Sequence, residues 1–345
     1  MAIFNFGPWE TKGLPVLDSA LPADVTVEAT KSATFEVKIT KDGNPKEYTY
    51  QWYYDGKAVS GATSASYTRT TTKSDGGNHL VHCTVTNKAG TITSRTANMS
   101  VDDSAYRVPQ FTYTGEYKLV NNNFKTIEQG SLTDNWNLLL TSSGVLTFTN
   151  LGNAVNGVDV CLVGGGGSGG YGQASGGGGG GGGYTKNVAN YNLKNNNRYS
   201  FIIGGSDGDT TGFGYTAKSG VAGESATSVP GYGSDGGSGG GYGDAGSGGS
   251  DGSDGGKSPQ GVGVVGKGQG TTTRLFGDWI LVAGGGGGWN GAGGAGGGGA
   301  GAYDYTKASD GEDMYGGGGG GAGVYGGYYY GGRGGSGCIA IRNKR

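Results

Sequence analysis

Glycine is concentrated in the second half of the chain to a degree that few folds can accept. Of the 83 glycines among 345 residues, 70 lie in the last 182, residues 164–345. Each glycine costs roughly 0.5–1 kcal/mol more to order than alanine would. This half therefore either stays unfolded or adopts a fold that requires the absence of side chains.

Apolar runs inside the glycine region favour an ordered structure. Four runs have the length and the β-branched and aromatic composition of strands, namely Val158–Val163, Tyr199–Ile203, Trp279–Ala283 and Cys338–Ile341. Tyrosine and tryptophan are also scattered through the glycine, whereas disordered spacers are poor in aromatic residues. Composition alone favours a flexible linker, so a chain in which only the first half folds stays open as an alternative.

Seven glycines follow a strict three-residue repeat: Gly237, Gly240, Gly243, Gly246, Gly249, Gly252 and Gly255. This period matches an extended left-handed helix with about three residues per turn. Collagen has the same period but depends on proline, and no proline lies between Gly231 and Ser258. We therefore expect polyglycine helices packed side by side, with N–H groups bonded to carbonyl groups of neighbouring helices.

Length and charge narrow the functional classes. The chain has room for two or three domains. A net charge of −2 gives no electrostatic footprint for nucleic acid, and the basic end of the chain (Arg342, Lys344, Arg345) is expected to be solvated. No apolar run approaches the roughly 18 residues of a membrane span. The N-terminus has no apolar signal core, so we expect no secretory signal.

The three cysteines, Cys83, Cys161 and Cys338, are too few for a disulfide framework and are not spaced like a zinc site. They are expected to be small buried apolar residues. Cys161 and Cys338 lie in expected strands that bound the glycine region. A disulfide between them is conceivable if these strands are neighbours, although a reducing site of assembly favours free thiols.

Residues 24–101 alternate polar and apolar residues in short runs with frequent turns, as in a small β-sandwich. Residues 33–40 predict a strand with Phe35, Val37 and Ile39 on one face. The Gln51-Trp52-Tyr53 run and the Cys83-to-Asn87 run resemble immunoglobulin-like domains of bacteria and viruses. The resemblance implies that Trp52 packs in the core. The partner cysteine is missing and Val81 replaces the usual tyrosine, so neither the disulfide nor the tyrosine corner is implied.

The remaining segments complete the expected organisation. Residues 1–23 form an N-terminal arm whose aromatic residues, Phe4, Phe6 and Trp9, are expected either to attach the chain to a larger assembly or to fold back onto its own sandwich. Residues 102–110 are expected to be a linker. Residues 111–345 form the glycine-rich domain, with a strand at 111–120 and a hairpin of 136–141 with 145–149.

The order of strands and glycine tracts in residues 111–345 resembles that of glycine-rich fibre proteins of phages and prophages of gut bacteria. The residues that carry this resemblance are the runs VDVCLVGGGGSGGYGQ, YSFIIGG, GQGTTTRLFG and GGSGCIAIR. The same plan is similar to the glycine-rich domain of anaplastic lymphoma kinase. The resemblance implies an all-β chain: an immunoglobulin-like sandwich, then a jelly-roll (tumour-necrosis-factor-like) sandwich that carries packed polyglycine II helices. It also implies a virion appendage that forms a homotrimer.

The sequence gives little support for an enzyme. His79 and His82 lie on opposite faces of one expected strand, and no nucleophile–histidine–carboxylate set can be assembled. The Gly255–Ser258 run departs from the phosphate-loop spacing. Acidic runs around Asp207 and Asp251 do not follow a calcium-loop pattern. We therefore expect no catalytic site, no cofactor and no metal.

Aromatic residues are the candidate binding residues, because tyrosine and tryptophan give a large contact area for little loss of conformational entropy. They gather in two sequence clusters between glycine tracts, and the full set is Tyr303, Tyr305, Trp289 and Tyr315, with Tyr325, Tyr328, Tyr329, Tyr330 and Arg333. The alternative role of each ring is to cap the end of a glycine bundle or to join subunits.

Taken with the aromatic residues, the resemblance implies a virion structural protein, assembled in the host cytoplasm, that is anchored to other virion proteins by its arm and contacts a glycan or protein of the bacterial surface. A head or neck decoration fibre without a specific receptor is the first alternative. A bacterial surface adhesin is the second, and it is disfavoured because no signal is recognised.

Overall fold

The structure of the protein is a computed structural model that describes residues 13–129, 135–173, 175–226, 231–243, 246–257, 264–303, 305–323 and 329–343. The chain divides into two compact units, Met1–Tyr106 and Arg107–Arg345. Within the described ranges the chain contains strands and short 3-10 turns, among them Ser104–Tyr106, Gly152–Ala154 and Leu275–Gly277, but no α-helix. The prediction of an all-β protein is confirmed.

From Gly13 onward, where its described residues begin, the first unit is built from ten strands in three groups. One sheet has the order β2-β10-β8-β5-β6 with β9 on β8, while β3 pairs with β7 and β1 with β4. All pairs are antiparallel except β10 with β2. The strands are β1 Val16–Leu17, β2 Val25–Glu28, β3 Ser32–Glu36, β4 Ile39–Lys41, β5 Thr49–Tyr54, β6 Lys57–Ala58, β7 Ser66–Thr70, β8 Gly77–Asn87, β9 Gly90–Thr93 and β10 Ala97–Asp102.

Trp52 lies at the centre of the first core, as predicted. Its side chain is fully buried beside Phe35 and Tyr67, and its indole Nε1 donates a hydrogen bond of 2.9 Å to the carbonyl of Ser64. Because the indole N–H has an acceptor, the core gains the apolar area of the ring without an unpaired donor. Cys83 is also fully buried, on the neighbouring strand β8.

The expected strand at residues 33–40 is interrupted. Phe35 and Val37 are buried and Glu36 and Lys38 exposed, so the predicted alternation is right. However, β3 ends at Glu36 and β4 begins at Ile39, and the two pair with different strands. The change of partner falls between Val37, whose N–H donates to the carbonyl of Ala65 next to β7, and Lys38, whose carbonyl accepts from the N–H of Asp18 next to β1.

The described part of the expected arm belongs to the first unit. Gly13 bridges to Asn44, and β1 pairs with β4, so the chain from Gly13 to Leu17 lies against the edge of this unit. Phe4, Phe6 and Trp9 lie outside the described residues. In the expected linker, Asp102 ends β10, a 3-10 turn covers Ser104–Tyr106, and Gln110 begins the next strand.

The second unit contains two sheets that share one core, and a two-stranded ribbon. The larger sheet has the order β12-β13-β20-β15-β16, the smaller one β11-β14-β17, and the ribbon is β18-β19. Side chains from both sheets form one buried cluster that includes Trp136, Phe148, Phe201 and Ile341. The strands are β11 Gln110–Tyr113, β12 Tyr117–Val120, β13 Trp136–Leu140, β14 Gly144–Asn150, β15 Val158–Val163, β16 Thr185–Tyr191, β17 Arg198–Phe201, β18 Thr210–Gly212, β19 Tyr215–Ala217 and β20 Cys338–Asn343.

One expected strand and one expected hairpin are wrong because the chain passes from one sheet to the other. The run 111–120 forms β11 in the small sheet and β12 in the large one, with a close approach at Gly115, where an added Cβ would lie 2.6 Å from the carbonyl oxygen of Ser143. The expected hairpin of 136–141 with 145–149 is likewise split, since β13 pairs with β12 and β20 whereas β14 pairs with β11 and β17.

The run Trp279–Ala283 is not a strand, and this prediction is also wrong. It makes one isolated bridge, from Leu281 to Arg274. Val282 and Ala283 are instead buried in a second apolar cluster against the outer face of the large sheet. Short apolar runs that cover a sheet and short apolar runs inside one have the same composition, so periodicity does not separate them.

Cys161 and Cys338 lie on the neighbouring strands β15 and β20, opposite Ala340 and Val163 respectively. All three cysteines of the chain are buried and free. Because Cys161 and Cys338 are diagonal to each other, the disulfide left open by the sequence does not form.

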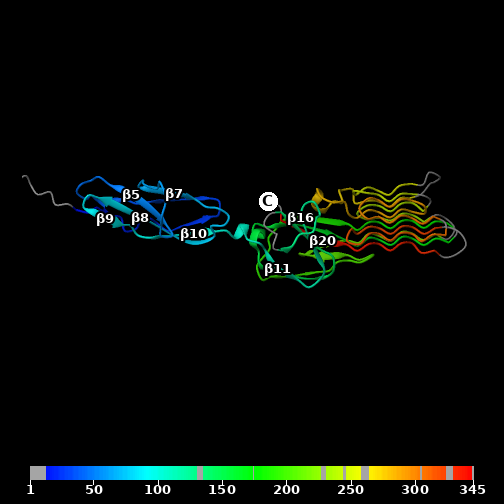
Figure 1. The fold of residues 1–345 in the computed structure, drawn as a ribbon. Helices are drawn as coiled ribbons and strands as arrows, with labels where there is room; N and C mark the ends of the chain where they lie inside the picture. The colour runs from blue at the N-terminus through cyan, green and yellow to red at the C-terminus, as the bar shows by residue number, and fades with distance from the viewer. Residues whose placement is uncertain are drawn as a thin grey trace, which may run out of the picture. The chain divides into compact units, whose positions relative to one another are not determined.

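The glycine tracts leave the large sheet as a set of extended runs that lie side by side, drawn beyond β16 and β20 in Figure 1. Along residues 177–184 the N–H groups cycle through three neighbouring runs. Gly177, Gly180 and Gly183 donate to Ala322, Gly319 and Gly316; Gly178, Gly181 and Tyr184 donate to Glu224, Val221 and Lys218; Gly179 and Gly182 donate to Gly241 and Ser238. A three-residue cycle of partners means three residues per turn.

This packing excludes side chains by contact. An ideal Cβ on Gly179 would lie 2.0 Å from the carbonyl oxygen of Gly286, and one on Gly180 would lie 2.1 Å from that of Gly167. Both distances are far below van der Waals contact, and both obstacles are backbone atoms of another run. The absence of Cβ is therefore what allows these backbones to bond directly to each other.

The seven-glycine repeat between Gly237 and Gly255 does not lie in one run. The N–H of Gly246 donates back to the carbonyl of Tyr242 (3.1 Å), so the run does not continue straight there, and the chain reverses at a turn where the N–H of Ser253 donates to the carbonyl of Ser250 (3.0 Å). Asp251 and Gly252 have φ of 52° and 81° in this turn. The period survives because each run has the same three-residue geometry.

Candidate recognition surface at the distal tip

The end of the glycine runs far from the strands is made of chain reversals, and we call this end the distal tip. The chain turns between Gly170 and Gly178, whose backbones bond to each other, and Ala322 bonds to Gly170. The turn at Trp289 joins the same end, because the N–H of Trp289 donates to Gly177. The N–H of Asn290 in turn donates to Ala302. Loops from distant parts of the sequence therefore meet at one end of the bundle.

The two tyrosine clusters that the sequence singles out meet at this tip. The rings of Tyr305 and Tyr329 have centroids 6.5 Å apart at an interplanar angle of 74°, an edge-to-face contact. Tyr329 also exchanges backbone hydrogen bonds with Gly172, which ties its loop to the first reversal. Tyr325 and Tyr328 lie outside the described residues.

Several tip tyrosines are exposed far beyond what a capping role needs. The exposed fractions are 59% for Tyr303, 72% for Tyr305 and 79% for Tyr330. Tyrosine combines a broad apolar face with a hydroxyl that exchanges hydrogen bonds, so exposed rings at a rigid end can contact either a sugar or a protein.

Local hydrogen bonds fix the loop that carries Tyr303 and Tyr305. The hydroxyl of Thr306 donates to the carbonyl of Tyr303 (2.6 Å) and accepts from its N–H (3.0 Å), and the N–H of Thr306 donates to the same carbonyl. Lys307 approaches Asp310 at 3.8 Å on the exposed side. These bonds fix the backbone from Tyr303 to Thr306 before any contact, which lowers the entropy lost on binding.

Trp289 and two further tyrosines form the inner part of the tip. Trp289 is half-buried against Gly176. A Cβ added to Gly176 would lie 2.2 Å from the Cβ of Trp289. Tyr232 and Tyr242 have ring centroids 6.1 Å apart, with Tyr242 buried and Tyr232 39% exposed. The sequence-based selection missed these two tyrosines, although their position among glycines is the signal that marked the others.

Tyr315 and Arg333 do not join the tip rings, contrary to the grouping from the sequence. Tyr315 lies at the opposite end of the bundle, where its carbonyl accepts from the N–H of Ala283 and its ring packs on the cluster that contains Cys161. Arg333 is exposed along the side of the bundle, with its N–H bonded to a carboxyl oxygen of Asp310 (2.9 Å). Sequence proximity misplaces both because each glycine run crosses the whole bundle in about six residues.

The histidines are engaged in structural contacts in the first unit. Nδ1 of His79 lies 2.8 Å from a carboxyl oxygen of Asp55, and its Nε2 lies 2.9 Å from the carbonyl of Asp75. His82 stacks on Tyr53 at 4.8 Å. Over the described ranges no three His, Cys, Asp or Glu residues are grouped as metal ligands would be. No helix in those ranges is long and apolar enough to cross a membrane.

Comparisons with known proteins give no family. No protein-family model matches the chain, and no curated protein matches it. Among solved structures, a quinoprotein alcohol dehydrogenase-like protein from Bacteroides thetaiotaomicron matches at 12% identity and a TM-score of 0.21, over 55% of this chain and 54% of that one. The chain thus spans about half the length of that protein, and a likeness this weak supports neither a fold nor a function.

Proposed function

We propose that the chain is a structural protein of a bacteriophage virion, a non-enzymatic fibre or appendage protein whose distal tip contacts the bacterial surface. The observation that carries this proposal is the gathering of exposed tyrosines from two distant loops on one end of a hydrogen-bonded glycine bundle. Exposed aromatic rings on a pre-organised support are typical of recognition surfaces.

The finer description of the fold belongs to the same proposal. The first unit is interpreted as an immunoglobulin-like sandwich, in keeping with Trp52 at its centre, and the two sheets of the second unit as a jelly-roll sandwich. The glycine runs are interpreted as polyglycine II helices, which is supported by the three-residue cycle of bonding partners.

The proposed assembly is a homotrimer in the virion. The aromatic residues Phe4, Phe6 and Trp9 precede the first unit in sequence and are proposed to attach the chain to other virion proteins. The partner at the tip is proposed to be a glycan or protein of the bacterial surface, because tyrosine faces suit both.

Binding of the purified full-length protein to whole cells of enteric strains tests the role of the tip. The variant Tyr305→Ser with Tyr330→Ser should bind at least about tenfold more weakly. A matched control, Tyr117→Ser, removes a tyrosine that is 39% exposed on β12 of the same unit and should bind normally. Equal binding by the tip variant and the control would contradict the recognition role.

Immunogold labelling of phage particles tests the location. Labelling at the end of a tail or fibre supports the proposal. Labelling on the head or neck, with normal adsorption of particles that carry the tip variant, would instead indicate a decoration fibre. Labelling of phage-free cells would indicate a bacterial adhesin.

A further inference from the structure

A row of polar residues crosses the outer face of the large sheet, at the end opposite to the distal tip. Asn137 on β13, Arg342 on β20 and Asp159 on β15 are directly opposite one another in the strand register. On the three central strands the rest of this face is apolar, with Leu139, Cys161 and Ala340 among its residues, and it is covered by the segment that contains Leu275 and Val282. A polar row in such a place has to be compensated by specific partners.

Arg342 is the polar residue of this row with the most interactions. Its side chain is only 8% exposed, so the expectation that it belongs to a solvated chain end is wrong. Its Nη1 donates to Asp278 (2.6 Å) and its Nη2 to Asp159 (3.3 Å). The guanidinium also lies 4.2 Å from the centroid of the Phe276 ring. Two carboxylates therefore face one guanidinium, and the site as a whole carries one net negative charge.

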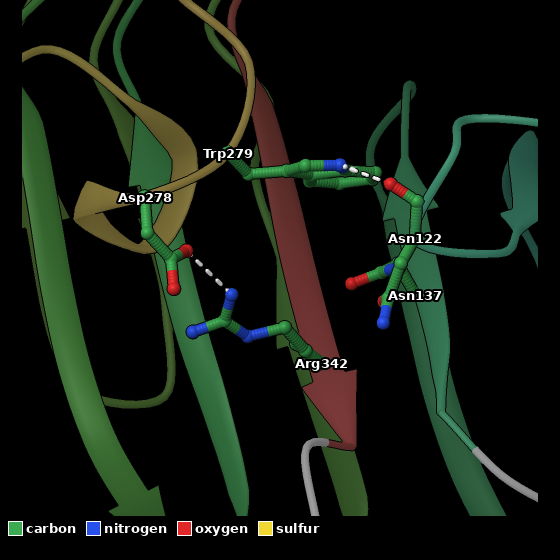
Figure 2. A pocket seen from close by; sticks show the side chains of 5 residues that line it. All are labelled: Asn122, Asn137, Asp278, Trp279 and Arg342. Carbon is green, nitrogen blue, oxygen red and sulfur yellow. Dashed lines mark hydrogen bonds and ion pairs between the residues drawn. The ribbon is translucent and has the colours of Figure 1, made fainter.

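Beside this ion pair lies a pocket of about 180 Å³ lined by Asn122, Asn137, Asp278, Trp279 and Arg342. Figure 2 shows the indole of Trp279 edge-on across the top of the pocket, with Arg342 beneath it, Asp278 on one side and the two asparagines on the other. The indole is held in this orientation because its Nε1 donates to the carbonyl of Asn122 (2.8 Å). The indole also packs on the ring of Phe124, with a centroid distance of 5.3 Å and an interplanar angle of 54°.

Two buried polar atoms of the pocket residues are unpaired among the described residues. The side-chain oxygen of Asn137, a residue with no exposed surface, has no donor, and Nε of Arg342 has no acceptor. The amide nitrogen of Asn137 is already directed to the side-chain oxygen of Asn122 (3.2 Å). Buried polar atoms without partners are uncommon in folded proteins and call for a specific explanation.

We infer that this pocket binds one neutral pyranose ring of a carbohydrate. A sugar hydroxyl donates and accepts at once, so hydroxyls can bond to the exposed side chains of Asn122 and Asp278 at the rim. The unpaired atoms of Asn137 and Arg342 lie buried beneath this surface, and a small shift of their side chains on binding would let hydroxyls supply the donor that Asn137 lacks and the acceptor that Arg342 lacks. The flat indole face offers the apolar surface on which a pyranose ring stacks. The site's negative charge disfavours acidic sugars and phosphate, because Arg342 is already neutralised by two carboxylates.

The size of the pocket agrees with a ligand of this class. About 180 Å³ is far more than a single water molecule requires. It is well below the roughly 300–1,000 Å³ of pockets for drug-sized ligands. A single sugar ring is intermediate between the two. This inference does not depend on the tip, since no tip residue lines the pocket.

Saturation-transfer NMR with the full-length protein and the methyl glycosides of glucose, galactose, mannose and N-acetylglucosamine tests the inference. At least one glycoside should bind with a dissociation constant of about a millimolar, the range expected of a ligand with so few contacts. Asn137→Ala should weaken that binding about tenfold or more, because the buried amide is lost. The matched control Asn187→Ala changes an exposed asparagine on β16 outside the pocket and should leave binding unchanged.

Two further variants keep the test decisive if Asn137→Ala impairs folding. Asn122 and Asp278 are exposed at the rim of the pocket. Asn122→Ala and Asp278→Asn should therefore reduce glycoside binding, while the melting temperature should stay within about 3 °C of that of the wild type. The tip variant Tyr305→Ser with Tyr330→Ser should bind the glycoside normally. Absence of saturation transfer to every glycoside, or equal transfer with all pocket variants, would overturn the inference and leave a pocket filled by water.

Discussion

Replacement of a single buried glycine, Gly180→Ala, should disrupt the glycine bundle. The new Cβ would lie 2.1 Å from the carbonyl oxygen of Gly167 and 2.6 Å from that of Ser168. Contact requires more than 3 Å, so one run has to move by about 1 Å. The obstacles are backbone atoms, and no side chain can rotate away to make room.

The magnitude follows from the hydrogen bonds next to this site. Gly180 donates to Gly319 at 2.9 Å and Gly167 donates to Gly181 at 2.8 Å. A displacement of about 1 Å breaks or weakens both and leaves buried groups unpaired, at about 1–3 kcal/mol each. We therefore expect a loss of about 3–5 kcal/mol, which for a unit of this size corresponds to roughly 6–20 °C in melting temperature.

Gly205→Ala is the matched control. It adds the same methyl group in the same unit, but nothing lies within 4 Å of the new Cβ. Because alanine lowers the conformational entropy of the unfolded chain, this variant should be unchanged or more stable by up to about 1 kcal/mol.

Differential scanning calorimetry of the full-length protein measures both variants, with urea unfolding followed by tryptophan fluorescence as a second method. Similar melting temperatures for Gly180→Ala and Gly205→Ala would refute the reasoning, because they would mean that the runs do not touch as the structure shows.

Three further predictions concern other parts of the chain. Burial raises the pKa of Cys83 to about 11 and that of Cys161 to about 12, and it raises the pKa of Cys338 as well. Iodoacetamide should therefore label none of the three thiols at about pH 8 until the protein is unfolded. Rapid labelling of the native protein would contradict their burial. Burial opposes the charged form of His79, but hydrogen bonds to Asp55 and to the carbonyl of Asp75 raise its pKa above 6.5. The stabilisation is therefore complete below about pH 6.5 and is lost as the pH rises through the folded-state pKa, so the first unit should melt lower at about pH 8 than at about pH 6, and His79→Gln should abolish that difference. Trp52→Phe leaves the carbonyl of Ser64 without its donor and should destabilise the first unit by about 2–3 kcal/mol. In calorimetry, an equal shift of the unfolding transition of the second unit would argue against two separate units.

Strands with a clear apolar pattern could be predicted from the sequence. β15 and β20 lie where the apolar runs predict them, and Trp52 lies in the core. The sequence predicts that β13 and β14 pair as a hairpin, and this is wrong. A short turn after an apolar strand can form either a hairpin or a corner between two sheets, and the sequence pattern does not separate the two. The strand predicted at Trp279–Ala283 is wrong for a related reason. An apolar composition indicates that a segment is buried, but not that its backbone forms hydrogen bonds with another strand.

The candidate sites show a similar division. Exposed tyrosines among glycines were recognisable, because aromatic residues have no role in a flexible tract. Their grouping depends on where each run reverses, and therefore Tyr315 was placed at the wrong end. The polar pocket had no sequence signal, since Asn137 and Arg342 are 205 residues apart and meet only through strand register.

Amide hydrogen exchange of residues 177–183, followed by mass spectrometry at single-residue resolution, tests the central claim most directly. All seven N–H groups are bonded to neighbouring runs. A rigid bundle that supports a recognition tip should therefore protect them by several orders of magnitude, as in the core strands β15 and β20. Exchange at the rate of an unstructured glycine peptide would mean that this half of the chain is a tether, and the proposed function would lose its support.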